Sequence, residues 1–232
     1  MRDHLVFTLT ATFGAMGDLA GHERRGSWTW PGRSAIIGLL AAAKGIRRDG
    51  DFTALDALSV SVAIFDAGAP LRDYHTVQTV PTAKVKRPQS RPSALRDVGD
   101  DVNTTITLRD YRLCPLYGVA LTGDGLEDLQ NALLEPVFTL YLGRKSCTLA
   151  SPMGPKIVRA TDAAAALAHI TLPPWWPTEK AIATQLLSGG EPSAPGVMET
   201  RHDAPLDRRL WHFSERRFHR QIVRIAPLEA AH

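Results

Sequence analysis

A short run of residues that ends in two adjacent cations and a hydroxyl carries the most specific chemistry in this chain. The run Phe138–Cys147 breaks at Gly143 and then presents Arg144, Lys145 and Ser146. A glycine lets the backbone approach a ligand closely, and the side chains that follow donate hydrogen bonds to phosphate oxygens. The run therefore predicts an anion-binding turn at the end of a strand. A basic turn in this position is also typical of solvated scaffolding.

Two further basic segments indicate that one long polyanion is followed. They run from Arg24 to Arg48 and from Lys84 to Arg112, and 21 of the 27 basic residues are arginine. The planar guanidinium binds phosphate with two donors and stacks on bases, so this bias favours a nucleic-acid partner. An arginine-rich and alanine-rich chain is also typical of a GC-rich genome. The net charge is only +3, so the clustering of the cations carries the argument.

Cations next to flat rings form one group of predicted RNA contacts. Arg24 and Arg25 precede Trp28 and Trp30 within a few residues. This combination suits backbone charge together with base stacking, which contributes roughly 1–3 kcal/mol per base. Core packing explains the two tryptophans equally well.

The start of the first predicted helix forms a second group. Arg33 and Ser34 open a helix whose free backbone N–H groups and positive dipole end receive a phosphate readily. Ser34 fits the N-cap of the same helix equally well.

A third group of predicted RNA contacts lies at the two ends of a long insertion between predicted strands, the excursion over residues 78–108. Tyr74 and His75 follow one strand, and Arg109 and Tyr111 return at the other end. Two aromatic rings, an imidazole and a guanidinium would grip unstacked nucleotides. His75 could instead act as an acid or base in RNA cleavage, but no second histidine lies nearby in the sequence to act as its partner.

The hydrophobic periodicity predicts a ferredoxin-like α+β domain over residues 1–150. Strands and helices alternate as β-α-β, a long excursion, and β-α-β again. The predicted elements are Leu5–Ala11, Ala35–Lys44, Leu58–Phe65, Leu116–Leu121, Leu126–Leu134 and Phe138–Leu142. RNA-recognition domains share this fold, although the aromatic signature of their central strands is missing from this sequence.

The excursion over residues 78–108 is too long for a hairpin turn. It carries prolines and the cations Lys84, Lys86 and Arg87, with almost no large apolar residues. Such a segment is either an arm that becomes ordered on a partner or a disordered loop. Strand character returns at Thr104–Leu108, which favours the arm.

The sequence of residues 151–232 predicts a small, irregular β-rich subdomain. Prolines and glycines separate it from the first domain, a short helix follows at Ala163–Ala168, and Phe218–Ile225 reads as a final strand. The spacing of His202, His212 and His219 lies outside the usual zinc motifs, so we expect no metal site and no cofactor.

Composition places the chain in a reducing compartment. Cys114 and Cys147 have neither metal-ligand spacing nor the density of a disulfide scaffold. No apolar run approaches the length that crosses a bilayer, and the N-terminus starts a strand instead of a signal peptide. We therefore expect a soluble, cytoplasmic protein without a membrane partner.

Three blocks of the sequence resemble a known family in their order and spacing. They are Trp30–Leu40 continuing to Gly45–Asp49, Leu71–Val77, and Tyr141–Cys147. Together they resemble the CasD subunits of type I-E CRISPR Cascade, which belong to the RAMP superfamily. The resemblance covers most of the chain but is loose in the excursion and after Pro152.

The resemblance implies a ferredoxin-like palm, an inserted β-hairpin thumb and a C-terminal β subdomain. It implies a non-catalytic subunit that holds the 5′ handle of the CRISPR RNA beside the backbone subunit and the large subunit, and that meets target DNA through the assembled complex. Related proteins cut the RNA precursor by metal-free acid–base chemistry, so an endoribonuclease is the alternative. A free-standing RNA-binding domain of another pathway is a third reading.

Overall fold

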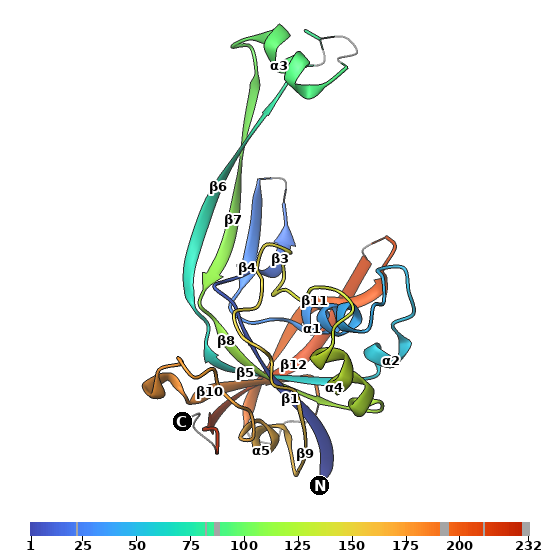
Figure 1. Ribbon diagram of the computed structural model, residues 1–232, viewed down its shortest axis with the longest axis vertical. Helices are drawn as coiled ribbons and strands as arrows, with labels where there is room; N and C mark the ends of the chain where they lie inside the picture. The colour runs from blue at the N-terminus through green and yellow to red at the C-terminus, as the bar shows by residue number, and fades with distance from the viewer. Residues whose placement is uncertain (22, 82, 86–88, 191–194, 211, 229–232) are drawn as a thin grey trace.

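Two β-sheets and a projecting hairpin make up the computed structural model of the chain (Figure 1). The structure describes residues 1–21, 23–81, 83–85, 89–190, 195–210 and 212–228. Strands predominate over helices, so the predicted mixed α and β class is confirmed. Among the described residues, no helix is both long enough and apolar enough to span a bilayer.

The larger sheet has seven strands in the order β11-β12-β10-β5-β8-β1-β9, and every neighbouring pair is antiparallel. Four neighbouring strands belong to two β-α-β units: β1 (Arg2–Thr10), α1 (Arg33–Ala43) and β5 (Ser59–Asp66), then β8 (Leu116–Thr122), α4 (Leu126–Leu134) and β9 (Lys156–Ala160). The remaining strands are β10 (Ala183–Ser188), β11 (Gly196–Asp207) and β12 (His212–Ile225). Strands from both predicted segments thus share one sheet, and a boundary at residue 150 stays a prediction.

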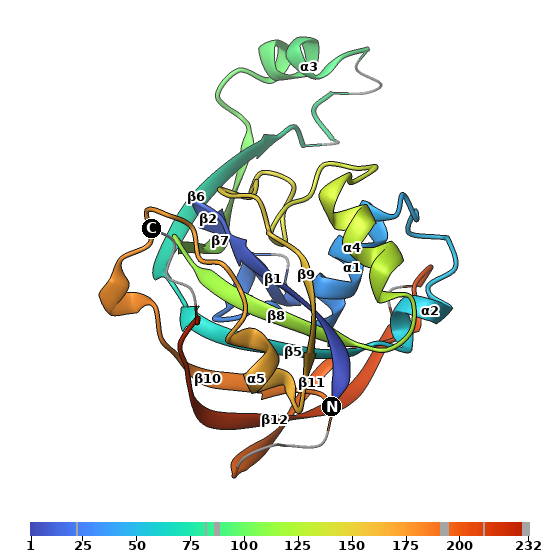
Figure 2. The same cartoon turned by 60° about the horizontal axis from the view of Figure 1, so that its bottom comes forward.

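Alternating side chains build a core on each face of this sheet. Phe7 of β1 and Val119 of β8 face α1 and α4, which pack side by side (Figure 2). Their neighbours Val6 and Ala120 face the opposite side, which is covered by α5 (Ala163–Leu167). Because side chains of successive strand residues point to opposite faces, one apolar strand serves both cores.

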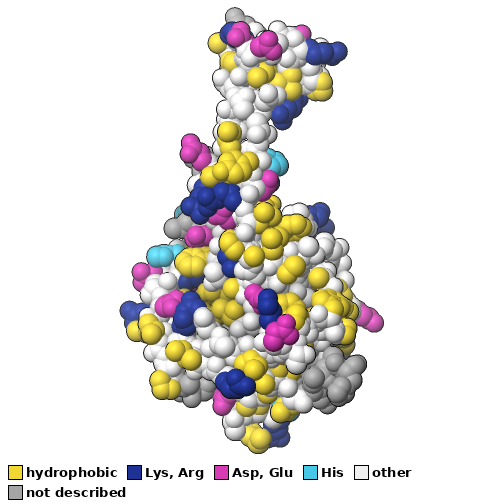
Figure 3. All heavy atoms as spheres, turned by 90° about the vertical axis from the view of Figure 1, so that its left-hand side faces the viewer, with side chains coloured by type: hydrophobic (Ala, Val, Ile, Leu, Met, Phe, Trp, Pro, Cys, Tyr) yellow, Lys and Arg dark blue, Asp and Glu magenta, His cyan; other side chains and the backbone are white. Residues whose placement is uncertain are grey.

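The smaller sheet supports the hairpin. It contains β2 (Phe13–Gly14), β3 (Met16–Ala20), β4 (Arg24–Trp28), β6 (Ala69–Thr79) and β7 (Asn103–Leu113). Strands β6 and β7 pair without interruption from Ala69 with Leu113 to Thr79 with Asn103. The hairpin rises from the body as a narrow stalk with charged and hydrophobic side chains on its visible face (Figure 3).

Two predictions about the elements need correction. The segment Phe138–Leu142 is not a strand, because its backbone turns over the end of α1: the N–H groups of Val137 and Phe138 donate to the carbonyls of Ala43 and Ala42. Strand β9 takes the expected place beside β1.

The predicted excursion also differs from its sequence reading. Its strands extend to Ala69 and Leu113, beyond residues 78–108, and α3 (Arg91–Val98) was not predicted. Ser90 caps this helix by accepting a hydrogen bond from the Ser93 N–H, and Ala94 within the helix is buried. Short connecting elements, α2 (Thr53–Asp56) and a 3-10 turn at Thr178–Lys180, were also missed.

Candidate RNA interface

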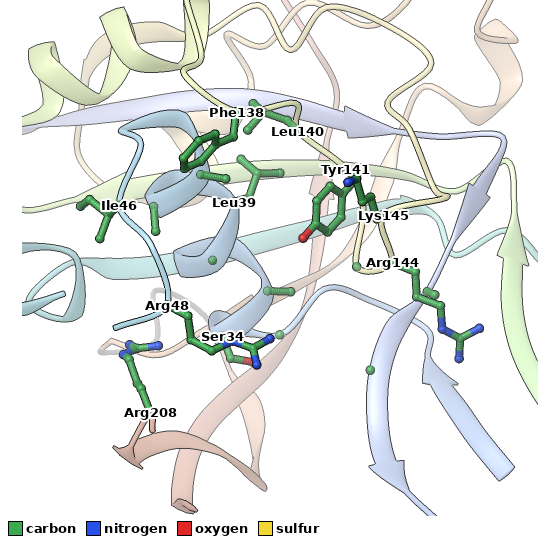
Figure 4. A pocket seen from close by; sticks show the side chains of 18 of the residues that line it. Ser34, Leu39, Ile46, Arg48, Phe138, Leu140, Tyr141, Arg144, Lys145 and Arg208 are labelled. Carbon is green, nitrogen blue, oxygen red and sulfur yellow. The ribbon is translucent and has the colours of Figure 1, made fainter. Parts of the chain in front are cut away.

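A groove of about 870 Å³ runs between α1 and the turn that follows α4; we call it the α1 groove (Figure 4). Ser34, Gly38 and Ala42 follow one another at four-residue spacing along α1 and line one wall. Because these side chains are small, the wall presents nearly bare helix backbone. Phe138 and Tyr141 of the turn form the facing wall and remain partly exposed.

Cations surround the groove. Arg47 and Arg48 enter it from the loop after α1, and Lys145 enters it from the turn. Arg201 of β11 and Arg208 just after that strand complete the lining. Flat rings beside exposed cations suit a single-stranded nucleic acid, since the rings accept stacked bases and the cations pair with phosphates.

Four of the predicted contact residues meet in this groove: Ser34, Gly143, Arg144 and Lys145. Ser146 follows them and is exposed. Figure 4 shows the Arg48 side chain beside Ser34 at the start of α1, whereas Arg144 points away from the other labelled cations. The structure thus gathers the turn and the helix start in one place.

Gly143 has a structural reason of its own. Its φ is +90°, and a Cβ atom there would lie 1.7 Å from the carbonyl oxygen of Ala15. Only glycine fits this position, because the turn must pass directly over the chain that leads into β3. The Ala15 N–H donates to the carbonyl of Leu142 at 3.1 Å and fixes this contact.

Arg144 connects the turn to the hairpin sheet. Its Nη2 donates to the carbonyl of Arg25 at 3.2 Å, and its guanidinium lies 4.6 Å from the centre of the Tyr111 ring. Phe13 packs on the same ring edge-to-face at 6.2 Å. Arg144 therefore holds the groove and the hairpin together, while Lys145 is exposed to the groove.

The start of α1 differs from one sequence reading. Ser34 is not the N-cap; Gly32 is, and it has no side chain with which to cap the helix. Arg33 lies against the body, because its guanidinium donates to the carbonyls of Asp56 at 2.6 Å and Leu58 at 3.2 Å. Its side chain is only 15% exposed, which leaves little of it for a ligand.

Arg24 is held by a carboxylate at the root of the hairpin. It donates to Asp110 at 2.8 Å, and Arg72 donates to the other oxygen of the same carboxylate at 2.7 Å. The hydrogen bonds from Arg72 and Arg24 lower the pKa of Asp110. Arg25 is exposed next to them on β4.

The remaining predicted contacts are spread along the hairpin. His75, Arg109 and Tyr111 share one of its faces, whereas Tyr74 projects from the other face opposite Leu108. The side chain of Tyr74 is 69% exposed, and His75 Nδ1 lies 3.7 Å from Asp73.

At the tip of the hairpin, Lys84 pairs with Asp101. Lys86 and Arg87 lie outside the described residues. The predicted hairpin residues in the described part of the chain do not line the α1 groove, although Tyr111 contacts Arg144, which does.

Sequence reasoning did not select the cations that come from elsewhere in the chain. The adjacent Arg47 and Arg48 stood within a basic segment, and Arg201 and Arg208 belong to an arginine-rich stretch from Arg201 to Arg224 that is typical of a groove lining or a tail, but nothing in the sequence places that stretch beside the turn. Core packing and an exposed ring were the two roles considered for the tryptophans, and each has one of them. Trp30 is 3% exposed and packs on Phe218, while Trp28 is 40% exposed.

The three histidines of the C-terminal segment lie on long strands. His202 belongs to β11, and His212 and His219 belong to β12. Across residues 1–228 with the gaps given above, no group of three or more histidine, cysteine or acidic side chains is placed to hold a metal ion.

The family described as "CRISPR-associated protein (Cas_Cas5)" matches residues 4–219. The "CRISPR system Cascade subunit CasD" of Escherichia coli (strain K12) is 33% identical over 186 residues, which span 72% of this chain and 76% of that protein.

Two solved structures share the fold. A chain of a "CRISPR RNA-guided surveillance complex" aligns over 99% of this chain and 93% of its own length, with a TM-score of 0.72 and 23% identity. A "Crystal structure of Cas protein" aligns over 98% of this chain and 100% of its own, with a TM-score of 0.68 and 22% identity. At these identities the two structures support the fold alone.

Proposed function

Because the chain belongs to the CRISPR-associated Cas5 family, we propose that it is a non-catalytic RNA-binding subunit of a type I-E Cascade surveillance complex. In this role it holds the 5′ handle of the CRISPR RNA and caps the row of backbone subunits. The large subunit lies beside it, and target DNA reaches it through the assembled complex. The relative from Escherichia coli, itself described as a Cascade subunit, supports this assignment.

The α1 groove is the observation that carries the proposal. Its helix wall is nearly flat because of Ser34, Gly38 and Ala42, so a sugar–phosphate backbone can approach closely. Lys145 lines the groove from the turn opposite this wall, and Arg48 lies beside Ser34 at the start of α1 (Figure 4). Groove binding of this kind weakens steeply with salt, because each phosphate that is neutralised releases counterions.

The architecture supports a ferredoxin-like palm. Strands β9, β1, β8 and β5 lie in the spatial order that two β-α-β units of that fold produce, with their helices on one face. We assign the palm to residues 1–150, the thumb to the insertion around residues 78–108, and a C-terminal subdomain to residues 151–232.

An endoribonuclease is the second candidate, and His75 is the residue that it would use. Metal-free cleavage needs a base and an acid within hydrogen-bond reach of one phosphate. Tyr74 and His75 project from opposite faces of the hairpin, and Lys84 pairs with Asp101 at its tip. This arrangement supports binding over cleavage.

Purification of the chain with its native operon partners, followed by sequencing of the bound RNA, tests the assignment. We expect RNAs that share one 5′ handle, and unchanged RNA processing in a His75→Ala strain that holds the handle less tightly. Specific cutting of precursor repeat RNA by the purified wild-type chain, lost on His75→Ala, would replace the proposal with the nuclease.

A further inference from the structure

We propose that β11 and the residues that follow it complete a phosphate-binding subsite at the N-terminus of α1, with Arg201 and Arg208 as its cations. The inference rests on the proposed function and gives the C-terminal segment a part in it. The ligand is a phosphate group, which a phosphodiester of the RNA backbone or free phosphate could supply.

The first turn of α1 lacks a cap. The helix has eleven residues, and its N-cap is Gly32, which has no side chain to accept from the first N–H groups. An uncapped helix start carries partial positive charge and free donors, both of which favour an anion. The Ser34 hydroxyl lies within the first turn and lines the groove.

Arg201 brings a buried and incompletely paired guanidinium to the same point. Its side chain is 7% exposed and lies between the rings of Trp28 and Trp30, 4.7 Å from each centre. Its Nη2 donates to the Gly17 carbonyl at 3.3 Å, but among the described residues its Nη1 has no hydrogen-bond partner.

Arg201 also contacts the helix start directly. A Cβ atom on Gly32 would lie 2.9 Å from Arg201 Nη1 and 2.8 Å from Asp203 Oδ2, so only glycine lets both side chains lie against the helix start. Because Arg201 also lines the α1 groove, its charge acts on whatever occupies the groove at this end.

The carboxylate nearest Arg201 is used by another residue. Arg216 donates to both oxygens of Asp203, at 2.7 Å and 2.9 Å, whereas the closest approach of Arg201 to Asp203 is 3.9 Å. Asp18 adds a second opposite charge nearby. Burial lowers the pKa of Arg201 to about 10, so the guanidinium remains charged at neutral pH.

A second carboxylate is shared on the other side of the helix start. Arg208 donates to both oxygens of Asp56, at 2.7 Å and 2.9 Å, and Arg33 lies 3.4 Å from the same carboxylate. Four arginines and three aspartates thus meet around the first turn of α1. Together with the helix dipole they leave excess positive charge, which one phosphate would balance.

Salt-dependent binding of a short single-stranded oligouridine to the full chain tests the subsite. We expect Arg208→Gln and Arg201→Gln each to weaken binding and to lower the slope of log affinity against log salt by about 0.7, the value for one lost phosphate contact on a single strand. Arg220→Gln is the matched control, since Arg220 of β12 pairs with Glu199 of the neighbouring β11 and does not line the groove. Its slope should equal that of the wild type.

Tryptophan emission distinguishes the two sources of phosphate, because Arg201 lies on Trp28 and Trp30. A change with oligouridine alone assigns the subsite to the RNA backbone, and a change with inorganic phosphate as well assigns it to any phosphate group. No change with either ligand would overturn the subsite.

Slopes of both groove variants equal to that of Arg220→Gln would also overturn it. Where Arg201→Gln does not fold, Arg208→Gln decides, since Arg208 is partly exposed. A wild-type chain that binds no RNA would refute the proposed function itself. If the wild type binds RNA and Lys145→Ala weakens that binding, but neither Arg201→Gln nor Arg208→Gln does, this inference alone is refuted.

Discussion

Replacing Gly143 with alanine should damage RNA binding without removing a single charge. The turn that carries Arg144 and Lys145 lies on the Ala15 carbonyl, and a Cβ atom at position 143 would come within 1.7 Å of that oxygen. The turn must therefore move away from the chain that leads into β3. Such a movement would displace both cations from the α1 groove.

The cost has two parts. A φ of +90° in a residue with a side chain costs roughly 1–2 kcal/mol. Relief of the clash breaks the hydrogen bond from Ala15 to Leu142, which contributes about 0.5–1.5 kcal/mol. The sum is about 1.5–3.5 kcal/mol of lost unfolding free energy. For a chain of 232 residues this lowers the melting temperature by roughly 3–14 °C.

Gly125→Ala provides the control. Gly125 has a φ of +74° at the start of α4, and a Cβ atom there would meet nothing within 4 Å. It should cost only the backbone term, roughly 1–2 kcal/mol, and leave RNA affinity unchanged. Thermal melting and salt-dependent RNA binding of both variants measure the difference. Equal melting temperatures, or normal RNA affinity in folded Gly143→Ala, would show that the turn does not depend on this contact.

Three other changes have distinct expected outcomes. Lys145→Ala should weaken RNA binding with an unchanged melting temperature. Arg144→Ala should weaken RNA binding and also lower the melting temperature by several degrees, because it removes the link between turn and hairpin. Equal melting temperatures of the two variants would contradict a structural role for Arg144. Joining Thr79 to Asn103 through an Asn-Gly turn should leave a folded body, measured by circular dichroism, that fails to enter the native complex; normal incorporation would show that the tip is dispensable. Asp110→Asn should remove an acid-sensitive part of the stability. The pKa of Asp110 is lowered in the folded chain, so its contribution is present above about pH 4 and is lost as the pH falls through the folded value; identical acid melting of variant and wild type would refute this.

Strong periodicity explains which elements the sequence predicts well. Strands β1, β5 and β8 and helices α1 and α4 follow clear apolar patterns, and the structure confirms all five within a few residues. The segment Phe138–Leu142 has the same alternation, but backbone hydrogen bonds to the end of α1 hold it as a turn. Strand β9 is short and has no strong pattern, so only its pairing with β1 identifies it.

The candidate site was predictable where its residues are close in sequence. Ser34 and Lys145 could be selected because a helix start and a basic turn have local signals. Arg201 could not, because it reaches the groove only through the position of β11 beside α1. Carboxylate partners are equally invisible in the sequence: Asp110 pairs with Arg24 and Asp56 pairs with Arg33, and no local signal indicates either pair.

The strand order of the large sheet has a consequence for how the chain is made. Strand β1 pairs only with β8 and β9, so its first partner emerges from the ribosome more than 100 residues later. At cellular rates of synthesis this delay is on the order of ten seconds, during which apolar strands β1 and β5 stay unpaired. The β6–β7 hairpin, by contrast, can close locally as soon as it is made. We therefore expect slow, late folding of the body and a gain in soluble yield when translation is slowed or chaperones are abundant.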